Sequence, residues 1–255
     1  MKNLRYVALL LAALIFSGEA SAWTVEVNRA ILKFAELNMS KRANKEVVAL
    51  LGTPLRDVEF VNKGKSQTRL NESGKSVTTE KEDAVVKLEK ALGALSNKNS
   101  SADERKAALL VAIEMTVDMH CIANVLIDKH VEKDFIYMRD NGRPKKSRWF
   151  KVEERKWQAM WHSQYHKSHG AFSADMYCYD WAIATKGKSK AYMKEPIAPR
   201  KWAERTGERA ILALKTFQPE AVVNMLEITK HEYLNDESMH EAAFHLANLL
   251  NKTLK

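Results

Sequence analysis

The 255-residue sequence contains few of the residues that interrupt helices, with 9 glycines and 5 prolines. Alanine, leucine, lysine and glutamate, which favour helices, are abundant instead. The sequence also lacks an internal repeat and a heptad pattern long enough for a coiled coil. Beyond residue 22, no apolar run approaches the roughly 18 residues of a membrane span. These absences predict one all-α, multi-helix domain over residues 23–255, without a transmembrane segment. We expect it to be a monomer.

The N-terminal region has the pattern of a secretory signal peptide. A positively charged start precedes a short apolar run over residues 7–16, and a small-residue cleavage site follows at Ala20-Ser21-Ala22. Such a run is too short for an ordinary transmembrane helix. We therefore expect residues 1–22 to be removed on export, which leaves Trp23 at the N-terminus of a periplasmic or secreted protein.

The formal charge of +9 arises from 41 Lys and Arg residues against 32 Asp and Glu residues. A basic surface favours acidic partners such as nucleic acid or anionic lipid headgroups, although the same charge can serve solubility alone. The cations are frequent in two segments predicted to be irregular, residues 129–151 and 186–199. The candidate contacts to single-stranded nucleic acid or another polyanion are Lys145, Lys146, Arg148, Lys186, Lys188 and Lys190.

Helical periodicity and capping signals predict the positions of the helices. Thr79 to Glu82 and Ser101 to Glu104 have the spacing of a capping box, so a helix should begin at each. The first expected helices cover residues 25–37, 43–51 and 79–95. A central helix should open at Ser101 and include residues 109–125. Later helices are expected at residues 153–165, 172–185, 200–215, 219–232 and 237–251.

The central segment, residues 109–125, is apolar almost all the way round, so as a helix it must lie in the protein interior. Glu114, Asp118 and Cys121 have i, i+4 and i+7 spacing, which places them in one row along that helix. Buried carboxylates are costly unless each meets a cation, a metal or several donors. The row therefore indicates either the remains of a site or a buried polar network.

The two cysteines, Cys121 and Cys178, can pair in an exported protein. The chain-entropy model values such a long closed loop at roughly 4 kcal/mol. Sequence alone is compatible with this bridge and with two free thiols.

Two further groups of residues have ligand chemistry. A free amine and the first carbonyl of Trp23 can chelate a metal at a mature N-terminus, although Trp23 can also simply pack. His162, His166 and His169 share one helix face at a spacing that suits zinc, although exposed histidines on a basic helix are more often solvated.

Four segments resemble the zinc-dependent single-strand-specific nuclease family (nucleases S-one and P-one), which is related to the bacterial zinc phospholipases C. The family's central helix carries His and then Gly-Asp-aliphatic-His-x-Pro-x-His, and residues 114–124 match it in register. Weaker matches lie at residues 155–163, 201–205 and 242–251, and Trp23 matches the family's N-terminal Trp. The resemblance implies the phospholipase C and P-one nuclease fold and hydrolysis of phosphodiester bonds by three zinc ions.

The same alignment counts against catalysis. Trp23 and Asp118 match family ligands, whereas amides replace imidazole at three of the other five matched positions, and amides are poor zinc ligands. The replaced positions are Asn28, Glu114, Asn124, Gln158 and His162. Trp23, Glu114, Asp118 and His162 remain, and these could hold one zinc ion. Alternatively, His162 or a nearby cation neutralises Asp118 as a buried ion pair.

These observations lead to one hypothesis and two alternatives. The leading hypothesis is an exported nuclease-like protein that has lost the trinuclear zinc site and with it catalysis, and that binds a polyanion. The first alternative is an active metal-dependent nuclease or phosphodiesterase with a smaller zinc site, in which Asp118 is the best candidate for a catalytic role. The second is a periplasmic interaction protein without a ligand site.

Overall fold

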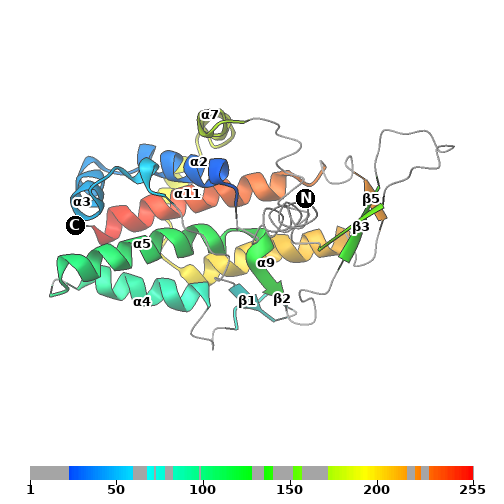
Figure 1. Cartoon of the computed structure of the whole chain (residues 1–255), viewed down its shortest axis with the longest axis horizontal. Coiled ribbons are helices and arrows are strands. Elements are labelled where there is room, and N and C mark those ends of the chain that lie inside the picture. Colours follow the sequence, from blue (N-terminus) through cyan, green and yellow to red (C-terminus); the bar gives the residue numbers. More distant parts are fainter. Residues whose placement is uncertain are drawn as a thin grey trace, which may run out of the picture.

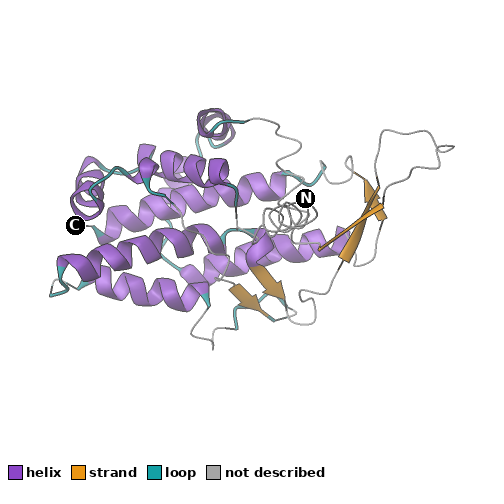
Figure 2. Ribbon diagram, viewed as in Figure 1, coloured by secondary structure: helices purple, strands orange, loops and turns teal. Residues whose placement is uncertain are grey.

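The computed structural model describes residues 23–59, 68–71, 73–77, 83–97, 99–127, 135–139, 152–156, 172–216, 222–224 and 230–254. Over this part of the chain the fold is mostly helical, with two small sheets (Figure 2). The predicted all-α class is therefore correct for the bulk of the described residues, while the family's specific fold stays a prediction. The expected signal peptide, residues 1–22, lies outside the described residues.

The helices are α2 (Val25–Leu37), α3 (Lys41–Leu51), α4 (Ala84–Ser96), α5 (Ala102–Met119), α7 (Ala174–Ala184), α8 (Ser189–Lys194), α9 (Pro199–Thr216) and α11 (Tyr233–Thr253). Two 3-10 turns are η1 (Leu55–Asp57) and η2 (Ile122–Asn124). The strands are β1 (Thr68–Leu70), β2 (Val125–Ile127), β3 (Phe135–Arg139), β4 (Val152–Lys156) and β5 (Val222–Asn224).

The long helices form the body of the molecule. Helices α2, α11, α5 and α4 run side by side in Figure 1, and the closest pairings are α4 with α5, α2 with α11 and α7, and α8 with α11. Their facing sides bury the largest apolar side chains, among them Trp202, Phe244, Ile31, Leu109 and Ile113. This core fixes the position of the C-terminal end of α5, where the predicted site lies.

Local capping chemistry explains where these helices begin. The Thr24 hydroxyl accepts from Val27 N at the start of α2. At the start of α5, Ser101 and Glu104 form the predicted capping box, with each side chain bonded to the other residue's backbone nitrogen. Helix α4 begins later than expected, because Asp83 accepts from Val85 N and caps it.

Gly207 lies inside α9 for a packing reason. A Cβ atom added at this position would lie 2.0 Å from Leu70 Cδ1 of strand β1. Any larger residue would therefore displace the buried Leu70 side chain, which explains a glycine at a position where helix propensity disfavours it.

Some predicted elements are wrong. Strand β4 occupies the beginning of the expected helix 153–165, and β5 lies inside the expected helix 219–232. Both strands pair with β3, β4 antiparallel and β5 parallel, and ladder pairing overrides the helix propensity of the local sequence. Conversely, the basic loop expected at 186–199 contains helix α8. Strand β1 pairs in parallel with β2 in the second sheet.

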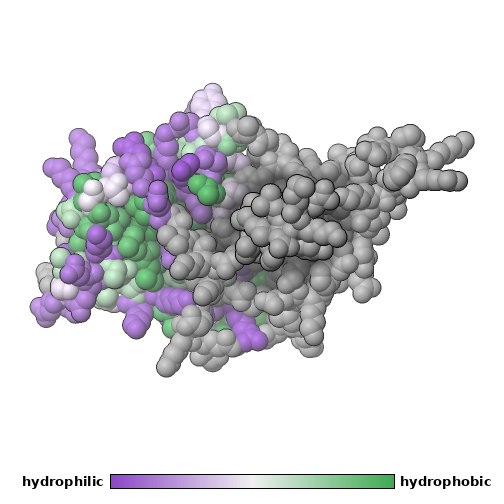
Figure 3. All heavy atoms as spheres, viewed as in Figure 1, coloured by the Kyte–Doolittle hydropathy of each residue, from purple (hydrophilic) through white to green (hydrophobic). Residues whose placement is uncertain are grey.

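The surface carries both polar and apolar side chains. On the face shown in Figure 3, green hydrophobic residues lie over the region of α11 and α5, with purple hydrophilic residues around them. Among the helices that the structure describes, none combines the length and the apolar character needed to cross a bilayer.

Candidate functional site

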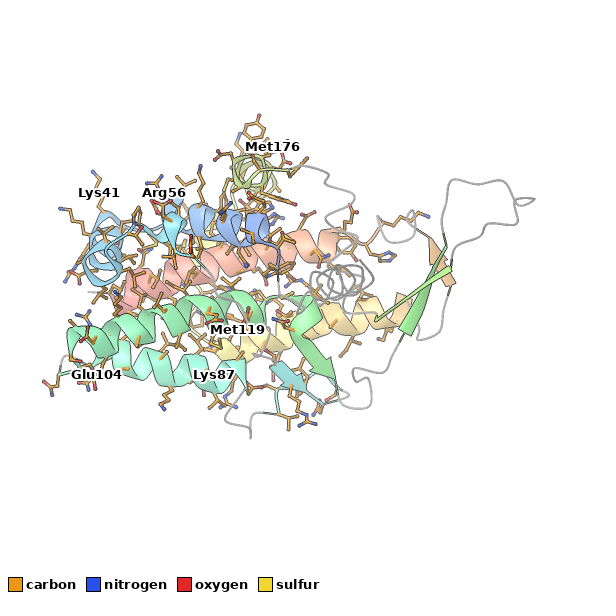
Figure 4. All side chains as sticks on the ribbon, in the orientation of Figure 1. Lys41, Arg56, Lys87, Glu104, Met119 and Met176 are labelled. Carbon is orange, nitrogen blue, oxygen red and sulfur yellow. The ribbon has the colours of Figure 1, made fainter. Side chains whose placement is uncertain are left out.

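The carboxylate row predicted on the central helix is shorter than expected. Helix α5 ends at Met119, which Figure 4 labels at the C-terminal end of that helix, so Cys121 lies beyond it at the start of η2. The prediction that residues 109–125 form one helix is therefore wrong beyond Met119. Of the predicted row, Glu114 and Asp118 remain on α5, one turn apart.

These two carboxylates differ in environment. Asp118 is 1 % exposed, whereas Glu114 is half-buried. Burial raises the pKa of Glu114, and the positive charge of Lys87 partly opposes that rise.

Trp23 packs against the last turn of α5. Its side chain is 2 % exposed, and its indole Nε1 donates to the carbonyl oxygen of Val117 at 3.3 Å. Asn124 Nδ2 donates to the backbone oxygen of Asp118 at 3.4 Å. The structure thus brings Trp23, Asp118 and Asn124 to the same end of α5, three of the positions that the nuclease resemblance singles out.

Two amides, Asn28 and Asn124, stand near this end of α5 at positions where the nuclease resemblance implies imidazoles. Among the described residues, no group of three or more His, Cys, Asp and Glu side chains is placed to hold a metal ion. Asn28, which the resemblance aligns with an early His, is buried, and its Oδ1 has no hydrogen-bond partner among the residues that the structure describes. His162 lies outside the described residues, so the smaller set of Trp23, Glu114, Asp118 and His162 stays a prediction.

The disulfide that the sequence allowed is not formed. Cys121 and Cys178 are both buried and neither is in a disulfide with the other. Cys178 lies on α7 against α2, where its Sγ donates to the backbone oxygen of Ala30 at 3.5 Å, while Cys121 lies at the end of α5. Burial raises the pKa of the Cys178 thiol to about 11.

Of the predicted basic contacts, Lys186, Lys188 and Lys190 lie within the described residues and are exposed. Lys188 precedes α8 directly, and Lys190 lies on that helix. The other predicted contacts, Lys145, Lys146 and Arg148, lie outside the described residues, as do His166 and His169.

A partly buried polar cluster that sequence reasoning missed joins α5, α9 and α11. It consists of His120 after α5, Glu195 after α8, Arg205 and Arg209 on α9, and Glu237, Glu241 and His245 on α11. The sequence does contain a signal for this cluster. Arg205 and Arg209 have i, i+4 spacing, and so do Glu237, Glu241 and His245, so each set lies on one helix face.

Glu241 is the ionic centre of this cluster. Its two carboxylate oxygens accept from Arg205 Nη1 at 3.1 Å and from Arg209 Nη1 at 2.9 Å. Burial raises the pKa of Glu241, but the hydrogen bond and charge of Arg209, with the charges of His120 and Arg205, outweigh burial and lower it to about 2. Glu241 is therefore a buried carboxylate held ionised by two guanidinium groups.

The imidazoles of the cluster are packed as well as hydrogen-bonded. The His245 ring stacks on Trp202 with centroids 4.3 Å apart and an interplanar angle of 9°. Burial lowers the pKa of His120 to about 3, and the charge of His245 lowers it further, against a hydrogen bond to Thr116.

A small hollow opens beside this cluster. Its volume is about 200 Å³, and it is lined by Glu195, Pro196, Ala198, Lys201, Trp202 and Arg205. It lies at the start of α9, where backbone N–H groups have no helical acceptor. The hollow is therefore lined by two members of the cluster, Glu195 and Arg205, and by the exposed Lys201.

No protein-family model and no curated protein matches this chain. The nuclease resemblance rests on its own motifs.

Proposed function

We propose that this chain is an exported nuclease-like protein that has lost the trinuclear zinc site and binds single-stranded nucleic acid, or a polyanion of like charge, through the basic surface around α8. The observation that carries polyanion binding is the charge of residues 186–201. This segment contains six cations and one carboxylate, that of Glu195, and the carboxylate is turned to Arg205 and His245.

The lysines of this segment are available to phosphate groups. Lys186, Lys188, Lys190, Lys194 and Lys201 are all exposed, and within the described part of the chain none of them forms an ion pair. Arg200 differs, because it binds Glu89 through two nitrogens at 3.0 Å. Phosphate contacts by several lysines give affinity that is independent of base sequence and depends steeply on salt.

The donor set supports the loss of the zinc site. Asn28 and Asn124 stand where the family has imidazoles, and the described carboxylates and imidazoles do not converge in a group of three. Amide oxygens bind zinc weakly compared with neutral imidazole. The proposed binding of a polyanion therefore needs only the positive charge and the shape of the protein surface.

Fluorescence anisotropy with a labelled single-stranded oligonucleotide tests the proposal. Affinity should fall steeply between low and physiological salt, with a slope of about −0.7 per phosphate contact. Replacing Lys188, Lys190 and Lys194 together by Gln should weaken binding and reduce that slope by about 2.

The matched control removes three charges from another exposed surface. Lys41, Arg42 and Lys45 lie on α3 and are exposed, and their triple Gln variant should bind nearly as well as the wild type. Equal losses in both variants would show that only net charge matters, and binding that salt does not affect would remove the polyanion hypothesis.

A further inference from the structure

His120, His245 and Glu195 form a continuous chain of contacts that starts at the backbone of α5. His120 Nδ1 lies 2.6 Å from the carbonyl oxygen of Thr116, and His120 Nε2 lies 2.8 Å from His245 Nδ1. His245 Nε2 in turn lies 3.1 Å from Glu195 Oε2. Both imidazoles are 0 % exposed, so solvent does not reach them directly.

Each of the three contacts needs one proton to be a hydrogen bond, and two neutral imidazoles supply only two. Because a carbonyl oxygen only accepts, His120 Nδ1 carries the proton of the first contact. His120 Nε2 is then bare, so His245 Nδ1 must donate in the second contact. This leaves His245 Nε2 bare and facing a carboxylate oxygen, which also only accepts.

The opposite tautomer of His245 does not remove the gap. It places the proton between His245 and Glu195, but it leaves two bare nitrogens facing each other at 2.8 Å in the contact with His120. With neutral imidazoles and an ionised carboxylate, one contact of the chain always lacks a proton.

The ionic charges nearby favour an added proton. Arg205 and Arg209 lie within ion-pair distance of three carboxylates, those of Glu195, Glu237 and Glu241. These five groups together carry one excess negative charge, which one proton would balance.

Other groups around His245 act in both directions. Burial lowers the pKa of His245, Glu241 of the same helix raises it, and Arg205 and Arg209 of α9 lower it. Among the described residues, the other titratable neighbours are His120, just after α5, and the ring of Tyr192 from α8, and Lys252 donates to the backbone oxygen of Glu195. Since burial is the largest of these influences, the added proton should bind below neutral pH.

We propose that the contact between His245 Nε2 and Glu195 Oε2 is a proton-binding site, which is empty at neutral pH and takes up one proton on acidification. The proton comes from solvent and is shared between the imidazole nitrogen and the carboxylate oxygen. When it is bound, a charge-assisted hydrogen bond joins α11 to the end of α8. Because Glu195 also lines the hollow beside Lys201, proton uptake makes that opening less negative.

Nitrogen NMR of protein labelled with 15N-histidine tests this inference, because a protonated ring nitrogen differs in chemical shift from a bare one. The protein is titrated downward from about pH 8, and folding is followed by circular dichroism. His245 is assigned from the signal lost in His245→Gln. We expect it to gain a second protonated nitrogen while the protein is still folded.

Glu195→Gln separates the proposed site from a merely structural contact. The Gln amide donates to His245 Nε2 and completes the chain without an added proton. The midpoint of His245 should therefore fall by about one to three pH units. At neutral pH, the chemical shift of His245 Nε2 in Glu195→Gln should differ from that in the wild type and move toward the value of a nitrogen that accepts a hydrogen bond.

Glu237→Gln is the matched control, because it removes one negative charge from the same cluster without touching the chain of contacts. Because the Glu237 side chain is 54 % exposed and solvent screens its charge, this midpoint should fall much less than that of Glu195→Gln. Equal midpoints in wild type and Glu195→Gln would overturn the proposal. So would a wild-type His245 that gains no proton before unfolding, or an unchanged neutral-pH signal in Glu195→Gln.

Discussion

The indole of Trp23 is hydrogen-bonded to the carbonyl oxygen of Val117, 94 positions away in the sequence. This contact places the residue expected at the mature N-terminus beside Asp118, at the C-terminal end of α5. The same arrangement is compatible with plain packing of an aromatic side chain and with a terminal chelate. Metal content separates these two interpretations.

We predict that the protein binds zinc far below one ion per chain. The sample must be exported with its own signal peptide so that the chain begins at Trp23, since an added residue would block a terminal chelate. Elemental analysis gives the metal content, and Asp118→Asn should leave it unchanged. Stoichiometric zinc that is lost in Asp118→Asn, together with phosphodiester hydrolysis, would favour the enzyme alternative instead.

The stability of the protein should decrease on acidification because of His240. This side chain is buried beside Trp181, and burial lowers its pKa to about 4. An unfolded histidine titrates near 6.5, so between about pH 6.5 and 4 the unfolded state binds the extra proton. The contribution of His240 is therefore complete above about pH 6.5 and is lost as the pH falls toward 4, by about 1.4 kcal/mol per pH unit.

Urea unfolding measured at several pH values checks this prediction. His240→Gln should show a shallower decrease of the unfolding free energy over the same interval than the wild type. Parallel curves for the two proteins would contradict the assignment of this slope to His240.

Removal of the buried carboxylate in Glu241→Gln should destabilise the protein strongly. Arg209, which is largely buried, and Arg205, which is 35 % exposed, would keep their charges while losing their common partner. Loss of one member of a buried ion pair costs about 3–5 kcal/mol. Thermal or urea unfolding measures the change.

The control for that variant is the surface pair of Arg200 and Glu89, in which both side chains are substantially exposed. Glu89→Gln should change the stability by about 1 kcal/mol or less, because solvent screens such a pair. Comparable losses in the two Gln variants would show that burial of Glu241 has little energetic effect.

Both cysteines should behave as protected thiols. Cys121 is 1 % exposed and Cys178 is 7 % exposed, and the raised pKa of Cys178 further limits its thiolate fraction. A thiol reagent at about pH 8 should react slowly with the native protein and rapidly after denaturation. If denaturation released no thiol until a reductant was added, a disulfide would be present.

Local patterns were sufficient to predict much of the helical scaffold. The stripe over residues 25–37, the capping box at Ser101 and the apolar face of the last helix match α2, α5 and α11. Each of these signals is local, because caps and helical faces depend on residues within a few positions of one another.

The nuclease resemblance predicted a ligand set of Trp23, Glu114, Asp118 and His162, of which the structure places Trp23 against the end of α5 that carries Asp118. Tertiary structure decided the rest. Strand β4 replaced a predicted helix because pairing with β3 is a non-local interaction that local propensity cannot show. Likewise, His120 and His245 lie 125 positions apart, and only the packing of α5 against α11 brings their nitrogens within hydrogen-bond distance.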